Sequence, residues 1–215
     1  MQMVRTRHFV ILVLVSLIAS LSPLGVAQAE EWKWTPGGTE QGKWLLGFRA
    51  GFAPLTQELR TNFSTDVGSL VNVQGMYSLN KWLLAGLTVE WERHGIDQER
   101  PPRDLGHMDT VSLLPTVEVR PGRLGPVAPY ASMGFGVNVN SFSESDNISG
   151  TTISPSNNFA WRLAWGADYF LTSALALNAE MAYKINDGHV TINGVQSGDW
   201  NASSFGFLFG VRAVF

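Results

Sequence analysis

The sequence predicts an all-β protein: an eight-stranded antiparallel up-and-down transmembrane β-barrel, preceded by a cleavable signal peptide. Segments of alternating apolar and polar residues recur along the chain, and most reach the roughly nine to eleven residues that a tilted strand needs to cross a bilayer. The links between these segments are alternately short and long. Aromatic doublets such as Trp161/Trp165 and Phe207/Phe209 lie on the strand face without charges, which is typical of lipid contact.

The N-terminal 29 residues are typical of a signal peptide. Arg5 and Arg7 are basic, an apolar run follows over residues 9–21, and Ala27-Gln28-Ala29 supplies a small-residue cleavage pattern. The run is short for a transmembrane helix, although an N-terminal anchor helix remains the alternative. We therefore expect three parts: a signal peptide over 1–29, a short periplasmic segment over 30–42 and an outer-membrane β-barrel domain over 43–215.

Composition narrows the class. After residue 29 no apolar run approaches the eighteen residues of a membrane-spanning helix. The chain has no cysteine, so a disulfide framework is excluded. A net charge of −3 gives no reason to expect nucleic-acid binding. The 22 glycines and 11 % aromatic residues fit a membrane barrel and, only slightly less well, a soluble β-sandwich, so alternation has to decide.

Alternation predicts four strands in the first half of the barrel. The first covers residues 43–53, where large apolar residues alternate with glycine and arginine. The second, 69–79, sets valines and a tyrosine against asparagine, glutamine and serine. The third, 82–94, opposes leucine, valine and tryptophan to two glutamates and a histidine. The fourth, 109–120, opposes valines to threonine, serine and glutamate, although Pro115 inside it is unusual because proline cannot donate to a strand ladder.

Four further strands complete the set. The fifth, 127–142, alternates methionine, phenylalanine and valine with glycine and asparagine. The sixth, 157–170, shows the clearest alternation, with two tryptophans opposite an arginine and an aspartate. The seventh, 174–186, opposes leucines, methionine and tyrosine to asparagine, glutamate and lysine. The last, 205–215, has four phenylalanines on one face and glycines and an arginine on the other.

The links predict the topology. Short links lie near residues 80–81, 121–126 and 171–173, and long polar links cover 54–68, 95–108, 143–156 and 187–201. This alternation, with both barrel termini on the short side, matches periplasmic turns and extracellular loops. A soluble lipocalin-like barrel also has eight such strands, but its apolar residues point inward. The uncharged aromatic face therefore favours a barrel that contacts lipid.

The outward face predicts an aromatic, lipid-facing belt. Its members are Trp44, Phe48, Trp91, Phe135, Trp161, Trp165, Tyr169, Phe205, Phe207 and Phe209. Aromatic side chains are enriched at both water interfaces of membrane barrels. We therefore expect these residues to contact outer-membrane lipid.

The inward faces predict a network of charges in the lumen. Its members are Arg49, Glu90, Glu92, His94, Glu118, Arg120, Arg162, Asp168, Glu180, Lys184 and Arg212. The interior of an eight-stranded barrel is just wide enough for its own side chains. Because buried charges must be paired, we interpret the set as an interlocked plug. A gated polar pathway for a small ion or solute is the alternative.

Catalytic and cofactor chemistry has little support. No serine is placed beside a histidine as a nucleophile would be, so we expect neither an enzyme nor a cofactor, and a lipid A-modifying enzyme is the weakest alternative. His107 with Asp109 and Asp187 with His189 offer only two loop ligands each, so no metal site is expected. The long loops either bind an unknown ligand or only connect strands.

The chain resembles the OmpW-like group of small outer-membrane barrels. Residues 127–138, VAPYASMGFGVN, resemble the "PYVGAGVN" fifth strand of that family, and residues 158–172 look like its following "GWALQAGVDYFL" strand and turn. The resemblance implies an eight-stranded outer-membrane barrel, sometimes linked to passage of small hydrophobic molecules through an apolar inner channel. The inward charges here depart from such a channel.

The end of the chain resembles outer-membrane proteins more widely. Gly210, Ala213 and Phe215 stand where the last strand of those proteins places a glycine, an apolar residue and a terminal aromatic. The resemblance implies that the barrel-assembly machinery reads these positions, and hence that the chain is delivered to the bacterial outer membrane.

Overall fold

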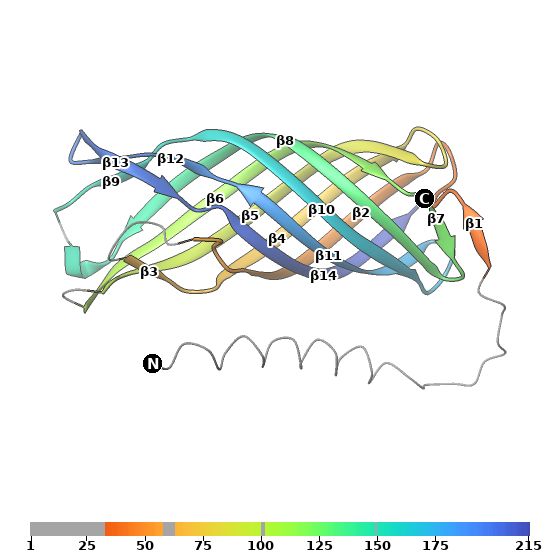
Figure 1. Ribbon diagram of the computed structural model, residues 1–215, viewed down its shortest axis with the longest axis horizontal. Coiled ribbons are helices and arrows are strands. Elements are labelled where there is room, and N and C mark those ends of the chain that lie inside the picture. The colour runs from red at the N-terminus through yellow and green to blue at the C-terminus, as the bar shows by residue number, and fades with distance from the viewer. Residues whose placement is uncertain (1–32, 58–62, 100–101, 149) are drawn as a thin grey trace. The chain divides into compact units, whose positions relative to one another are not determined.

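Eight strands form a closed antiparallel barrel, which confirms the predicted fold class (Figure 1). The computed structural model describes residues 33–57, 63–99, 102–148 and 150–215, so the expected signal peptide at 1–29 lies outside the described residues. Each barrel strand pairs with the next, and the last pairs with the first. The strands are β2 (Trp44–Ala53), β4 (Gly68–Ser78), β5 (Leu83–Glu99), β6 (Pro102–Val119), β8 (Val127–Glu144), β10 (Asn158–Phe170), β11 (Leu175–Ile185) and β14 (Ser204–Val214).

Shorter elements extend both ends of the barrel. We call the end with the tight links the short-turn end and the opposite one the long-loop end, on the right and left of Figure 1. At the short-turn end β1 (Trp34–Pro36) pairs with β7 (Gly122–Leu124). At the long-loop end lie β3 (Phe63–Thr65), the 3₁₀ turn η1 (Asp146–Ile148) and a separate sheet of β9 (Ile153–Pro155), β12 (Asp187–Ile192) and β13 (Val195–Asn201). No helix in the described ranges is long and apolar enough to span a membrane.

The prediction of long loops was wrong at two places, where the structure has paired strands. Residues 95–108 continue as β5 and β6, whose pairing runs past Gly95↔His107 to Glu99↔Pro102 through one register shift. Residues 187–201 fold into the β12–β13 hairpin. Alternation fails as a guide here because neither face of these hairpins is uniformly apolar. Backbone pairing extends the strands, together with the packing of a few of their side chains into the apolar cluster that contains Ile96, Leu105 and Trp200.

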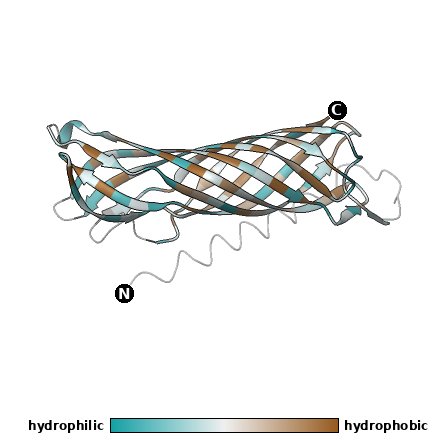
Figure 2. Ribbon diagram, turned by 90° about the horizontal axis from the view of Figure 1, so that it is seen from above, coloured by the Kyte–Doolittle hydropathy of each residue, from teal (hydrophilic) through white to brown (hydrophobic). Residues whose placement is uncertain are grey.

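Alternation succeeds within the barrel wall. Along β2, exposed and buried residues alternate almost without exception, and Figure 2 shows the hydropathy of the strands changing from residue to residue. Pro115 lies inside β6, as the strand predicted over residues 109–120 implies, and it is paired with Leu87 of β5. On the other side, the β6–β8 register skips from Leu113 to Thr116. The missing proline N–H is thus tolerated where the ladder is interrupted.

The core of the molecule lies inside the barrel, where three apolar clusters separate polar zones. Leu45, Met76 and Leu84 form the cluster nearest the short-turn end. A middle cluster is built from small side chains with Leu70 and Leu208. The third closes the long-loop end and contains Ile96, Leu105, Met108, Ile148, Trp200 and Ala202.

Candidate functional site

The lower lumen holds four charges that pair with one another near the short-turn end. Arg120, just after β6, contacts Glu118 and Asp168 at 2.6 Å each. Arg212 of β14 contacts the same carboxylates, at 3.0 and 3.2 Å respectively. All four side chains are fully buried. Each charge therefore has two opposite neighbours, which offsets the cost of burying it.

The middle of the lumen is organised around Glu180 of β11. Its carboxylate accepts from Arg49 of β2 and from Arg162 of β10, the latter at 2.6 Å, while Arg212 lies 3.9 Å away. Arg162 also donates through Nε to Glu90 of β5 at 3.0 Å. Glu180 thus joins the lower charges to the upper ones.

The upper lumen continues the chain of pairs toward the long-loop end. Lys184 of β11 lies 3.2 Å from Glu90 and also pairs with Glu92 of β5. Glu92 in turn lies 2.6 Å from His94 Nε2, and His94 Nδ1 is 3.4 Å from the Asp66 carbonyl oxygen. We call these ten paired charges together with His94 the charge ladder. It runs without a break from Arg120 to His94, and its five bases balance its five acids.

Tyr130 of β8 is the most important neutral partner, and the site predicted from the sequence did not include it. Its hydroxyl donates to Glu180 at 2.8 Å and accepts from Arg49 Nη1 at 3.3 Å. The guanidinium groups of Arg212 and Arg120 lie 4.2 and 5.5 Å from its ring centroid. These contacts also explain why Arg212 Nε and Arg120 Nη1 are buried without hydrogen-bond partners.

Buried amides complete the ladder. Asn72 accepts from Arg49 Nε at 3.1 Å and donates to Glu90 at 3.1 Å. Gln74 accepts from Arg212 at 2.7 Å, and Asn178 donates to Asp168 at 2.7 Å. Each lies at an inward position of its strand, so the alternation that identifies the charges also indicates these partners.

An uncharged polar zone lies beside the part of the ladder nearest the long-loop end, where Ser112 and Thr110 pair across strands with Glu90 and Glu92. Asn138 donates to the side-chain oxygens of Asn158 and Asn186 at 2.8 and 3.1 Å. Thr110 donates to Asn140 at 2.8 Å, and Ser112 donates to Asn138 at 2.7 Å. Together with the apolar cluster around Trp200, this zone fills the long-loop end of the lumen.

The residues expected in the lipid-facing belt lie on the outer surface. Trp44, Phe48, Phe135, Trp165, Tyr169 and Phe209 are exposed, and Trp91, Trp161, Phe205 and Phe207 are half-buried. Part of the set forms one aromatic row: Phe52 and Phe207 are 5.2 Å apart, Phe207 and Phe205 5.2 Å, and Phe205 and Trp165 5.8 Å. Contacts on both sides within this row account for the reduced exposure of Phe205 and Phe207.

The two histidine pairs of the loops behave differently. His107 Nε2 lies 3.5 Å from Asp109, whose carboxylate is held by Arg93 at 2.8 and 3.0 Å. His189 contacts Asp199 at 2.6 Å, so its pairing with Asp187 was wrong. Among the described residues, no three potential ligands gather as a metal ion would require.

The C-terminal residues close the barrel seam. Phe215 donates its N–H to the Trp44 carbonyl at 3.0 Å and accepts from the Trp44 N–H at 2.8 Å. Gly210 lies so close to β2 that a Cβ there would be 2.0 Å from the Phe48 carbonyl oxygen. Ala213 is paired with Leu175 on the outer face.

A family model described as "Outer membrane protein beta-barrel domain" matches residues 13–212. No curated protein sequence matches the chain significantly. Among solved structures, OprG from Pseudomonas aeruginosa has a TM-score of 0.67 at 14 % identity, covering 83 % of this chain and 98 % of its own.

Two further solved barrels are similar. Neisserial surface protein A (NspA) has a TM-score of 0.55 at 17 % identity, over 83 % of this chain and 100 % of its own. The outer-membrane protein AlkL has a TM-score of 0.51 at 15 % identity, over 87 % of this chain and 97 % of its own. At these identities the likeness extends to the fold alone.

Proposed function

Because the chain belongs to the outer membrane protein β-barrel domain family and lies in the bacterial outer membrane, we propose that it acts there as a closed barrel with a structural role in the envelope. The single observation behind this proposal is the continuity of the charge ladder along the lumen. Ions crossing the barrel would have to separate buried pairs. Breaking one such pair costs about 3–5 kcal/mol.

The lumen also departs from the kind of channel that the OmpW-like resemblance implies. A pathway for hydrophobic molecules needs an apolar wall, whereas charges and amides fill most of this interior. The apolar side chains inside the barrel form three separate clusters and no continuous apolar path. This arrangement favours closure over transport of either polar or hydrophobic solutes.

The proposed orientation follows from the ends of the barrel. The short-turn end faces the periplasm and the long-loop end faces outward, as in other membrane barrels. The aromatic belt contacts lipid. Gly210, Ala213 and Phe215 serve as the signal for the barrel-assembly machinery, with Phe215 held exposed beside Trp44.

A second proposed role is binding through the long-loop end. There the β12–β13 hairpin and the extensions of β5 and β6 pack on the apolar cluster around Trp200. These paired strands form an ordered surface on which a partner could bind. Among the described residues of the hairpin and these extensions, five carboxylates accompany a single arginine, Arg103: Asp97, Glu99, Asp104, Asp187 and Asp199. A cationic partner is therefore favoured. Replacing the β12–β13 hairpin with a short turn is expected to abolish such binding while the barrel still folds.

Planar-bilayer recording tests the closed barrel directly. The wild-type protein is expected to give no stable single-channel steps. A variant with Arg49→Ser and Glu180→Ser removes the Arg49–Glu180 pair, leaves Arg162 with Glu90 as its carboxylate partner and opens space at mid-height, so it serves as the conducting control. Stable wild-type steps that disappear in Arg49 or Glu90 variants would support the channel alternative instead.

The enzyme alternative has its own test. Mass spectrometry of lipid A from cells with and without the protein is expected to give identical profiles. A lipid A species that depends on the protein would replace the structural role with a catalytic one.

A further inference from the structure

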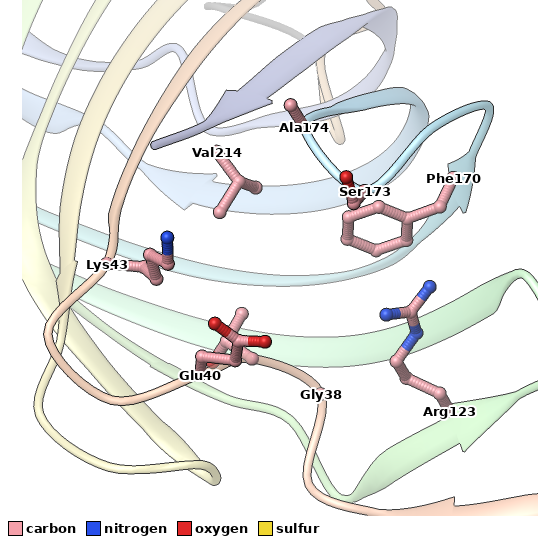
Figure 3. A pocket seen from close by; sticks show the side chains of 9 residues that line it. Gly38, Glu40, Lys43, Arg123, Phe170, Ser173, Ala174 and Val214 are labelled. Carbon is pink, nitrogen blue, oxygen red and sulfur yellow. The ribbon is translucent and has the colours of Figure 1, made fainter.

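A pocket of about 320 Å³ opens at the short-turn end of the barrel (Figure 3). Its walls come from the segment before β2, from β7, from the turn between β10 and β11, and from the end of β14. The lining side chains that matter are Glu40, Lys43, Arg123, Phe170, Ser173 and Val214. This volume is at the lower end of the range for small-molecule sites.

The floor of the pocket is a fixed segment over residues 37–42, which we call the strap. Its backbone N–H groups at Gly38 and Gly42 donate to the carbonyls of Lys81 and Ser78, both at 2.9 Å. Gly38 lies against the lowest arginine of the charge ladder, since a Cβ there would be 2.7 Å from Arg120 Cβ. The strap therefore places the pocket beside the closed lumen, with its shape set by the fold.

The three charged side chains around this pocket are not neutralised by one another. Within the described part of the chain, Glu40, Lys43 and Arg123 make no ion pair. The Arg123 guanidinium lies 4.1 Å from the Phe170 ring centroid, and its Nε is buried without a hydrogen-bond partner. Figure 3 shows the Glu40 carboxylate between Lys43 and Arg123, facing the same opening as Phe170 and Val214.

We propose that this pocket binds a small zwitterion: an amino acid or the end of a short peptide. Two cations, Lys43 and Arg123, recognise its carboxylate, and Glu40 accepts from its ammonium group. Ala174 and Val214 offer an apolar wall to its side chain, while the Phe170 ring holds the Arg123 guanidinium in place. A ligand with both charges satisfies all three unpaired groups at once, which a simple anion does not. The site goes beyond the proposed structural role, because it does not depend on whether the lumen conducts.

Calorimetric titration of the full barrel in detergent micelles tests the proposal with three probes. Dialanine carries both charges, N-acetyl-dialanine lacks the ammonium, and dialanine amide lacks the carboxylate. Dialanine is expected to bind, and each blocked form to bind at least tenfold more weakly. No binding of dialanine at millimolar concentration, or equal binding of all three, overturns the proposal. Displacement of dialanine by inorganic phosphate at equal concentration also overturns it, because that outcome defines a general anion site.

Variants then assign the contacts. Arg123→Gln and Lys43→Gln are each expected to weaken dialanine binding at least fivefold. Glu40→Gln is expected to abolish the difference between dialanine and N-acetyl-dialanine. Lys81→Gln is the matched control, since it removes the ammonium over Trp82 at the same end of the barrel, keeps the backbone carbonyl that holds the strap at Gly38, and lies outside the pocket lining. If Lys81→Gln weakened dialanine binding as much as Lys43→Gln, binding would depend on long-range charge attraction and not on contacts in the pocket, and the proposal would be overturned.

Discussion

The charge ladder and the short-turn pocket contain the same types of charged residue, but the residues are paired in the ladder and are not paired in the pocket. In the ladder, arginines, a lysine and carboxylates are buried and every charge has at least one opposite neighbour. In the pocket, Glu40, Lys43 and Arg123 lie at the barrel mouth and make no ion pair among the described residues. Charges that satisfy one another hold a structure together, whereas unmatched charges around a pocket remain available to a ligand.

The difference arises from where the residues lie in the fold. Ladder residues occupy inward positions of neighbouring strands, so barrel closure forces them into contact across a narrow lumen. Pocket residues come from a strap, a strand start and a turn, where solvent can screen their charges. Substitutions in the two regions should therefore affect different properties, stability in the ladder and binding in the pocket.

The largest expected effect is in the ladder. Glu180→Ala leaves Arg49 and Arg162 with a missing buried partner and removes the acceptor of Tyr130. The free energy of unfolding is expected to fall by about 3–5 kcal/mol in urea titrations in detergent micelles. Asp199→Ala is the control, since that carboxylate is 82 % exposed, and it should change stability by less than about 0.5 kcal/mol. Similar losses in both variants would mean that the ladder charges are hydrated.

The next largest effect on stability is expected where strands β14 and β2 approach each other closely at Gly210. Gly210→Ala places a methyl group 2.0 Å from the Phe48 carbonyl oxygen, so it is expected to cost about 1–3 kcal/mol of unfolding free energy. Gly75→Ala, where the nearest atom is Leu46 Cδ2 at 3.5 Å, should be nearly neutral. Equal effects would show that backbone entropy, and not strand packing, decides the result.

A smaller effect is expected from a substitution that distinguishes the contribution of the Tyr130 hydroxyl to stability from that of its ring. Tyr130→Phe keeps the aromatic face under Arg212 but removes the hydrogen bond to Glu180. We expect a loss of about 1–2 kcal/mol in the same titrations. Tyr169→Phe, on the exposed outer surface, is the control and should leave the midpoint unchanged.

The smallest effect on stability is expected in the pocket. Arg123→Gln should lower the unfolding free energy by about 1 kcal/mol or less, because Arg123 is half-exposed, makes no ion pair among the described residues and loses only its contact with the Phe170 ring. The same variant is expected to lose dialanine binding. A large loss of stability would place Arg123 with the ladder residues and remove the contrast between the two regions.

Much of the barrel was predictable because a strand places successive side chains on opposite faces. That rule located β10 to within one residue and placed Arg162 and Asp168 inward. It failed at 95–108 and 187–201, where paired strands continue beyond the region in which one face must be apolar. It also missed His189–Asp199, because hairpin register decides that contact.

Alternation and local motifs were enough to predict the strand faces, the outer-membrane location and the balance of inward charges. The closed barrel, in contrast, sets the contacts of Glu180 with both Arg49 and Arg162 and the position of Tyr130 under Arg212. The same closed fold brings Glu40, Lys43 and Arg123 around one pocket. The physical reason is that strand tilt and stagger set which residues meet across a closed barrel, and no period along the chain encodes them.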